Sequence, residues 1–140
     1  MGKINWGRVF LCGIVTGSVS AFLQLLVFLF ALPQTEFVTG VEAAGRAGRP
    51  AVYALSRIVL LSVGILTIWL YAAIRPRYGP GPKTAAVAAL AVWLSGALVD
   101  LDWVNSGLTP LAFGALLVPL AVALPAHIAA TLLGAWQYKE

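Results

Sequence analysis

His127 is the only histidine in the chain, and its possible chemistry is the widest of any residue. It lies well inside a long apolar run, beside a predicted helix face of small residues at Ala126, Ala130 and Gly134. Small neighbours leave room for a flat ring, so one hypothesis makes His127 the axial ligand of a haem or a bacteriochlorophyll. The interpretation we favour is a neutral imidazole that hydrogen-bonds a side chain of another helix, with Gln24, Thr67 and Ser95 as candidates.

Three charged residues lie near the ends of apolar runs and form a second candidate group. Asp100 and Asp102 are two positions apart, so on a helix their side chains point in nearly opposite directions. Asp100 shares a stripe with Gly96 and is expected to face the protein interior, where an ion pair with Arg57 lowers the cost of burying either charge. The functional alternative is a proton or cation site. Asp102 is expected to face solvent or lipid headgroups.

The remaining polar residues form no recognisable catalytic set. The sequence has no Ser/His/Asp arrangement, no Cys/His cluster and no glycine-rich phosphate loop, and Cys12 is the only cysteine. Gln24 is the only amide in the first apolar run and is expected to bond across helices. We therefore expect a protein that is not an enzyme and that has no metal site.

Four apolar runs are long enough to cross a bilayer, and they predict an all-α, polytopic membrane protein. We place the spans near residues 9–32, 51–74, 84–104 and 109–136, in one domain that covers residues 1–140. Of the 140 residues, 61% are hydrophobic and only 10% are charged, whereas soluble domains carry about a quarter charged residues. The net charge of +4 comes from cations beside the spans, which indicates a lipid bilayer rather than nucleic acid as the partner.

The segment between the second and third spans sets the predicted orientation. It contains three prolines and two glycines, which we interpret as a loop from Ile74 to Thr84, and it carries Arg75, Arg77 and Lys83. With both termini in the cytoplasm, the inner side holds six cations and the outer loops hold two, which is the usual positive-inside bias.

Small residues recur at helical spacing and predict close helix packing. In the first span they occur at Gly13, Gly17 and Ala21, four residues apart. The third span is rich in alanine and contains Gly96, so we expect other helices rather than lipid to surround it.

Two short motifs carry a resemblance to a known group. The opening Lys3–Val9 (KINWGRV) and the segment Ile74–Ala85 (IRPRYGPGPKTA) resemble a family of small four-helix bacterial membrane proteins. The resemblance implies a bacterial inner-membrane protein and implies no activity.

Three functional interpretations remain open on the sequence. The first is a non-enzymatic structural or accessory subunit, packed against other membrane subunits or a second copy through its small residues. The second is a small transporter or channel that uses Arg57 and Asp100, although few polar groups are expected at membrane depth. The third is a subunit of a photosynthetic or respiratory complex that carries a pigment or haem on His127.

Overall fold

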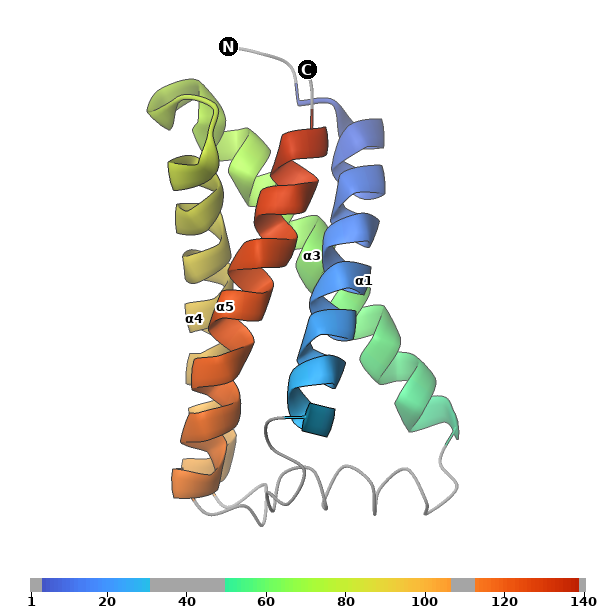
Figure 1. Ribbon diagram of the computed structural model, residues 1–140, viewed down its shortest axis with the longest axis vertical. Coiled ribbons are helices and arrows are strands. Elements are labelled where there is room, and N and C mark those ends of the chain that lie inside the picture. Colours follow the sequence, from blue (N-terminus) through green and yellow to red (C-terminus); the bar gives the residue numbers. More distant parts are fainter. Residues whose placement is uncertain (1–3, 31–49, 107–112, 139–140) are drawn as a thin grey trace.

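The computed structural model describes residues 4–30, 50–106 and 113–138, without the side chains of residues 28–29, 50–57, 103–104 and 113–115. In these ranges all regular structure is helical: α1 (Trp6–Phe30), α3 (Pro50–Tyr78), α4 (Pro82–Asn105) and α5 (Phe113–Gln137). The helices run up and down in one compact bundle (Figure 1). The predicted fold class is therefore confirmed. The expected start of the last span, at residue 109, lies outside the described residues.

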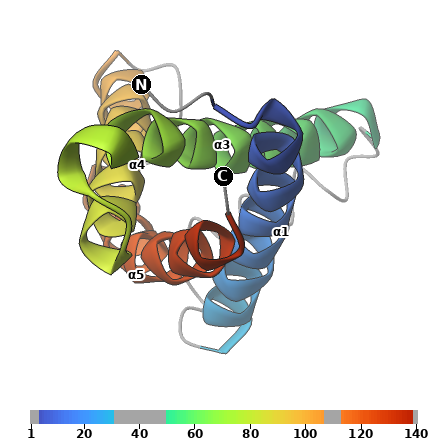
Figure 2. The same ribbon diagram turned by 90° about the horizontal axis from the view of Figure 1, so that it is seen from above.

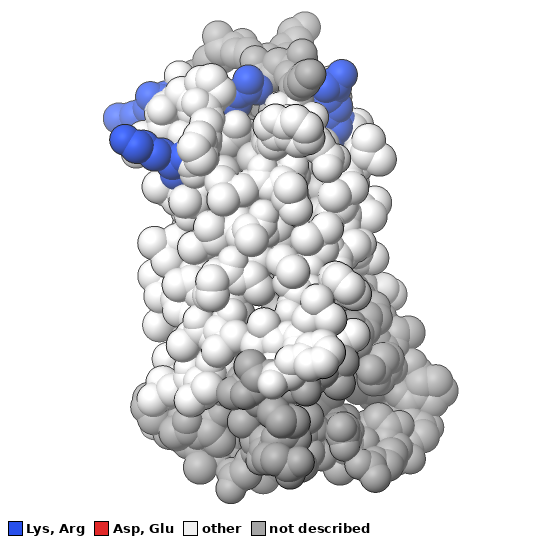
Figure 3. All heavy atoms as spheres, in the orientation of Figure 1, with Lys and Arg blue, Asp and Glu red and all other residues white. Residues whose placement is uncertain are grey.

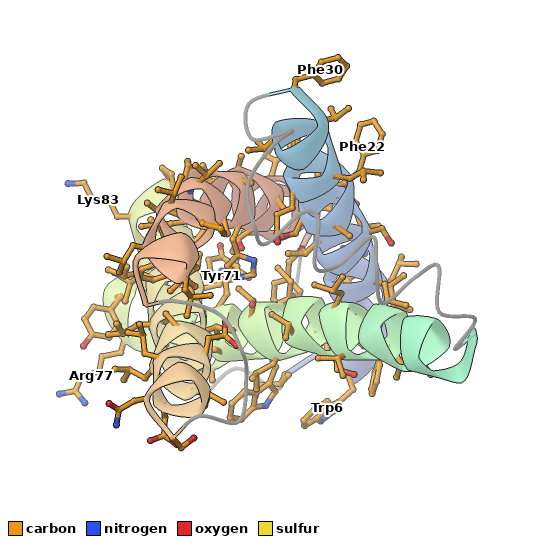
Figure 4. The ribbon with its side chains drawn as sticks, turned by 90° about the horizontal axis from the view of Figure 1, so that it is seen from below. Trp6, Phe22, Phe30, Tyr71, Arg77 and Lys83 are labelled. Carbon is orange, nitrogen blue, oxygen red and sulfur yellow. The ribbon has the colours of Figure 1, made fainter. Side chains whose placement is uncertain are left out.

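The surface of the bundle is apolar where that of a soluble protein would be polar. Each helix contains a stretch of 21 or 22 residues that is long and apolar enough to cross a membrane. Large apolar side chains cover the outside; Figure 4 shows Phe22 and Phe30 pointing away from the bundle, whereas Tyr71 points into it. A continuous apolar surface of this kind is suited to contact with the lipid bilayer. The chain is a multi-pass membrane protein.

The start of α1 and the turn between α3 and α4 differ from the predicted boundaries. The side-chain oxygen of Asn5 accepts a hydrogen bond from the Arg8 amide at 3.2 Å, so Asn5 caps α1, which begins at Trp6 rather than at residue 9. At the far end of α3, the predicted loop from Ile74 is wrong, because the helix continues through Pro76 to Tyr78.

The helical geometry of the last turn of α3 explains why a proline there does not end the helix. Proline has a helical φ, and its costs are one lost backbone hydrogen bond and the crowding of its ring against the carbonyl four residues earlier. The helical bonding continues beyond it, since the Gly79 amide donates to the Arg75 carbonyl at 2.8 Å. Gly79 has a φ of 82° and Gly81 a φ of 142°, both in the region that favours glycine. Residues 79–81 therefore make the turn, and Pro82 occupies the first position of α4.

The order of the helices around the bundle decides which side chains can meet. α1 packs against α3 and α5, and α4 packs against α5 and α3. Seen from above, α1 and α4 lie on opposite sides (Figure 2). α3 and α5 also contact each other, so side chains from α1, α3 and α5 can converge at one point.

The crossing of α1 and α3 depends on three glycines. A Cβ atom added to Gly64 would collide with backbone atoms of Gly13 and Gly17. A Cβ on Gly17 would lie 2.9 Å from the backbone oxygen of Leu60 and from the Cα of Leu61. The predicted packing role of Gly13 and Gly17 is therefore confirmed, while Gly64 was not predicted. Ala21 is half-buried on the same helix.

Small residues also bring α5 close to α1. A Cβ on Gly134 would collide with the Thr16 hydroxyl and would lie 3.1 Å from the Cys12 carbonyl oxygen. Ala126 and Ala130 are both buried. The packing role predicted for these three residues of α5 is confirmed.

Gly96 has no packing role within the described part of the chain, and packing of Gly96 against another subunit stays a prediction. Nothing lies within 4 Å of a Cβ built on this residue. The line of α4 residues turned inward runs through Ala89, Trp93 and Ala97, in steps of four, and passes beside Gly96. One side of α4 therefore faces away from the bundle, so the other helices described in this chain do not surround it.

The described charges separate to the two ends of the molecule. Cationic side chains gather at the end that bears the start of α1 and the end of α5, and the described residues on the face below them show none (Figure 3). Buried aromatic residues close this end: the rings of Tyr71 and Tyr138 meet edge to face at 6.1 Å, and the Arg75 guanidinium lies 5.8 Å from the Tyr138 ring centroid. The Tyr138 hydroxyl also accepts a hydrogen bond from the Asn5 amide at 3.3 Å.

Candidate functional site

His127 lies at the point where α1, α3 and α5 converge. Its side chain is buried, and each ring nitrogen faces a hydroxyl of a different helix. Nδ1 lies 3.3 Å from the Ser20 Oγ on α1, and Nε2 lies 3.2 Å from the Thr67 Oγ1 on α3. His127 therefore joins three helices through one ring, and Thr67 is one of the partners expected from the sequence.

The neighbouring hydrogen bonds assign a direction to this chain of polar groups. The Thr67 hydroxyl lies 2.8 Å from the Val63 carbonyl, and when it donates its proton there it accepts from His127. Nε2 must then carry the ring proton, and Nδ1 must accept the proton of Ser20. Ser20 in turn accepts from the Gln24 amide nitrogen at 3.0 Å. Each group in the chain donates in the same direction, which corresponds to a neutral imidazole with its proton on Nε2.

The other buried polar residues also have partners inside the chain. Thr16 and Thr131 donate to the carbonyls four residues earlier, at 2.9 Å and 2.8 Å, and the Thr131 bond is to the carbonyl of His127 itself. Near the turn, Thr84 donates to the Gly79 carbonyl at 2.8 Å. Within the described residues, each of the six buried polar side chains therefore has a hydrogen-bond partner in the chain: Thr16, Ser20, Thr67, Thr84, His127 and Thr131.

The surroundings of His127 do not fit an axial ligand of a tetrapyrrole. Such a ligand needs a ring nitrogen that faces open space wide enough for a macrocycle. Here the hydroxyls of Ser20 and Thr67 occupy both nitrogen positions, and the side chain is 5% exposed. The small residues on α5 suggested such a space, but neighbouring helices occupy it, since Gly134 contacts Thr16. A haem or bacteriochlorophyll on His127 stays a hypothesis that a spectrum can test.

Two sequence-predicted partners are placed differently from expectation. Gln24 donates to Ser20, four residues earlier on its own helix, so its predicted bond across helices is wrong and its link to α5 is indirect. Ser95 is exposed and donates to the Ala91 carbonyl on its own helix at 2.9 Å. The contact between α4 and α5 instead includes the Trp93 indole, which donates to the Leu120 carbonyl at 3.2 Å.

The acidic candidates lie on the outside of α4. Asp100 and Asp102 are both exposed, as expected for Asp102, whereas the interior position predicted for Asp100 is wrong. The cause is the same as for Gly96, because the inward line of α4 passes through Ala97 and Leu101. The proposed partner Arg57 has a side chain outside the described residues, so the ion pair stays a prediction.

Ser20 is the residue of this site that the sequence reasoning missed. A signal for it was present, because Cys12, Thr16, Ser20 and Gln24 recur every fourth residue along the first span. In an apolar helix such a spacing places its polar groups on one face, which must turn towards partners. Its contact with His127 depends on which helices are neighbours in the bundle, and the sequence pattern does not predict that.

Comparisons with known proteins add no further evidence. No protein-family model matches the chain, and no curated protein or solved structure matches it. The resemblance of the KINWGRV and IRPRYGPGPKTA segments to small bacterial membrane proteins therefore stays a prediction, and the function has to be argued from the bundle itself.

Proposed function

We propose that the protein is a non-enzymatic accessory subunit of a larger membrane assembly. One observation carries the proposal: the buried side chains where α1, α3 and α5 meet hydrogen-bond to one another, in a series centred on His127. A transport path needs polar groups that face water or a substrate, and a catalytic site needs groups that face a reactant. Groups that bond only within the protein specify its packing instead.

The acidic residues support this interpretation over transport. An ion path through the bundle would use charged groups turned inward, but Asp100 and Asp102 are exposed at the end of α4. The described residues also contain no group of three histidine, cysteine or acidic side chains that could hold a metal ion. The described interior therefore favours a structural role over a transport path.

The outward side of α4 supplies a surface for a partner. Its exposed residues include Ala91, Ser95 and Gly96, and the Ser95 hydroxyl is already bonded to its own helix. Small residues let a second helix approach closely without a polar group left unsatisfied. We infer that a helix of another subunit packs here.

We further propose a bacterial inner membrane as the location, with both termini in the cytoplasm. Support for the orientation comes from the charge distribution: Arg8, Arg75, Arg77 and Lys83 lie at the end that bears the termini, and the described carboxylates Asp100 and Asp102 lie at the end of α4. Cations beside the spans favour the cytoplasmic side.

A photo-crosslinking experiment in native membranes tests the accessory role. A photoreactive amino acid is placed at Ser95 on the outward side of α4, and the matched control carries it at Phe22, which is exposed on α1. We expect an adduct between Ser95 and another membrane protein, and only lipid adducts from Phe22. An adduct with a second copy of this chain would replace the larger assembly with a homo-oligomer. Lipid adducts alone at both positions would contradict the proposal.

A further inference from the structure

A groove lies at the charged end of the bundle and is not used by the packing around His127. Its volume is about 350 Å³, within the range of small-molecule sites. It is formed where the end of α3, the turn at residues 79–81, the start of α4 and the end of α5 come together. The residues that line it include Tyr71, Gly81, Pro82, Ala85, Leu132 and Trp136.

The lining of the groove is apolar, and its rim is exposed. Tyr71 and Ala85 form buried walls, whereas Trp136 is 80% exposed. An exposed indole at the end of a membrane-spanning helix is typical of the boundary between lipid tails and headgroups. The groove therefore opens at the depth where the acyl chain of a lipid meets its glycerol and phosphate.

Cationic side chains flank the same end of the molecule. Lys83 directly follows Pro82 of the lining and is exposed, and Arg77 is exposed on the last turn of α3. Figure 4 shows both side chains reaching away from the bundle. Among the described residues, the carboxylates lie at the opposite end, on α4. An ammonium group with three donors is well suited to a phosphate at this position.

We propose that this groove binds one acyl chain of an anionic glycerophospholipid, with the lipid phosphate beside Lys83. The apolar walls accept the chain, and the neighbouring cation selects the headgroup. A neutral phospholipid fills the same groove but lacks a net charge to pair with Lys83. The inference concerns the lipid partner of this end and does not depend on the accessory role proposed above.

Native mass spectrometry of the delipidated full chain in a mild detergent tests the site. The probes are dioleoyl phosphatidylglycerol and dioleoyl phosphatidylcholine, which share their acyl chains and differ in charge. We expect one bound lipid per chain, with phosphatidylglycerol preferred about fivefold, the effect of one cation near an anionic lipid. Lys83→Gln should abolish the preference. Arg8→Gln, which removes an exposed cation from α1 at the same end, should preserve it.

A second pair of variants tests the groove itself. Leu132→Trp fills it and should weaken binding of both lipids, whereas Leu133→Trp, on the exposed side of α5, should leave binding unchanged. Equal binding by these two variants would overturn the groove as the binding site. Equal binding of the two lipids by the native chain would overturn the choice of an anionic lipid, and an unchanged preference in Lys83→Gln would overturn the role of Lys83. A lipid-free dimer would show that a second copy covers the groove. Lys83→Gln alters only an exposed side chain, so it decides the headgroup question even if Leu132→Trp does not fold.

Discussion

Replacing Thr67 by valine removes one hydroxyl from the chain around His127 and keeps the side-chain volume and branching. The substitution leaves the Nε2 proton of His127 without its acceptor at 3.2 Å, in a site where Thr67 is 0% exposed. A buried donor without a partner costs about 1–3 kcal/mol in soluble proteins, and hydrogen bonds between membrane helices average about 0.6 kcal/mol with a maximum near 1.7. We expect a loss of about 1–2 kcal/mol in the free energy of unfolding.

Thr131→Val is the matched control for this substitution. Thr131 is also 0% exposed and also donates to the carbonyl four residues earlier, but it has no hydroxyl bond to another helix. The loss of a bond within one helix is common to both variants, so the difference between them reports the bond from Thr67 to His127. The assay is unfolding by sodium dodecyl sulfate in bicelles, followed by tryptophan fluorescence.

A double-mutant cycle with His127→Leu completes the measurement. In that background Thr67→Val should cost no more than Thr131→Val, because the imidazole that made the difference is absent. Equal costs of the two threonine variants in the otherwise native chain would refute the hydrogen-bonded chain. So would a difference between them that persists without His127.

Three further outcomes are expected. Gly64→Ala should lower the free energy of unfolding by about 1–3 kcal/mol, because the added methyl group collides with the α1 backbone. Gly96→Ala should be neutral or stabilising, since a Cβ at this position meets no other atom. Equal effects of the two variants in bicelle unfolding would contradict the glycine crossing of α1 and α3. In a Cys-free background, an impermeant thiol reagent outside intact cells should label Ser106→Cys and not Pro80→Cys; labelling of position 80 would reverse the proposed orientation. Natively purified protein should show no visible absorbance that His127→Ala removes, and a band lost in that variant would support a tetrapyrrole ligand instead.

The features that the sequence predicted are those set by composition along one helix. Long apolar runs fixed the four spans, and the spacing of Gly13 and Gly17 correctly predicted a packing face. Pro76 misled the prediction, because α3 continues through this proline to Tyr78, and the loop does not begin at Ile74.

The features that the sequence did not predict depend on how helices face each other. Gly96 and Asp100 looked like interior residues by spacing, but α4 turns them outward because its inward line follows another row of side chains. Ser20 was missed for the same reason, because its contact with His127 forms only when α1 and α5 are neighbours.

The meeting of His127 with α1 and α3 has a consequence for the order in which the chain assembles. The glycine crossing of α1 and α3 needs only the first two helices described, so it can form while the rest of the chain is still being inserted. Ser20 and Thr67 receive their shared partner only with α5, the last of the described helices. Before α5 packs, these hydroxyls can donate to carbonyls of their own helices, as Thr67 does to Val63, so the free-energy cost of their missing partner is small. Assembly can therefore proceed through an early pair of helices, α1 and α3, to which α5 is added later, with the hydrogen bonds of His127 selecting the final register.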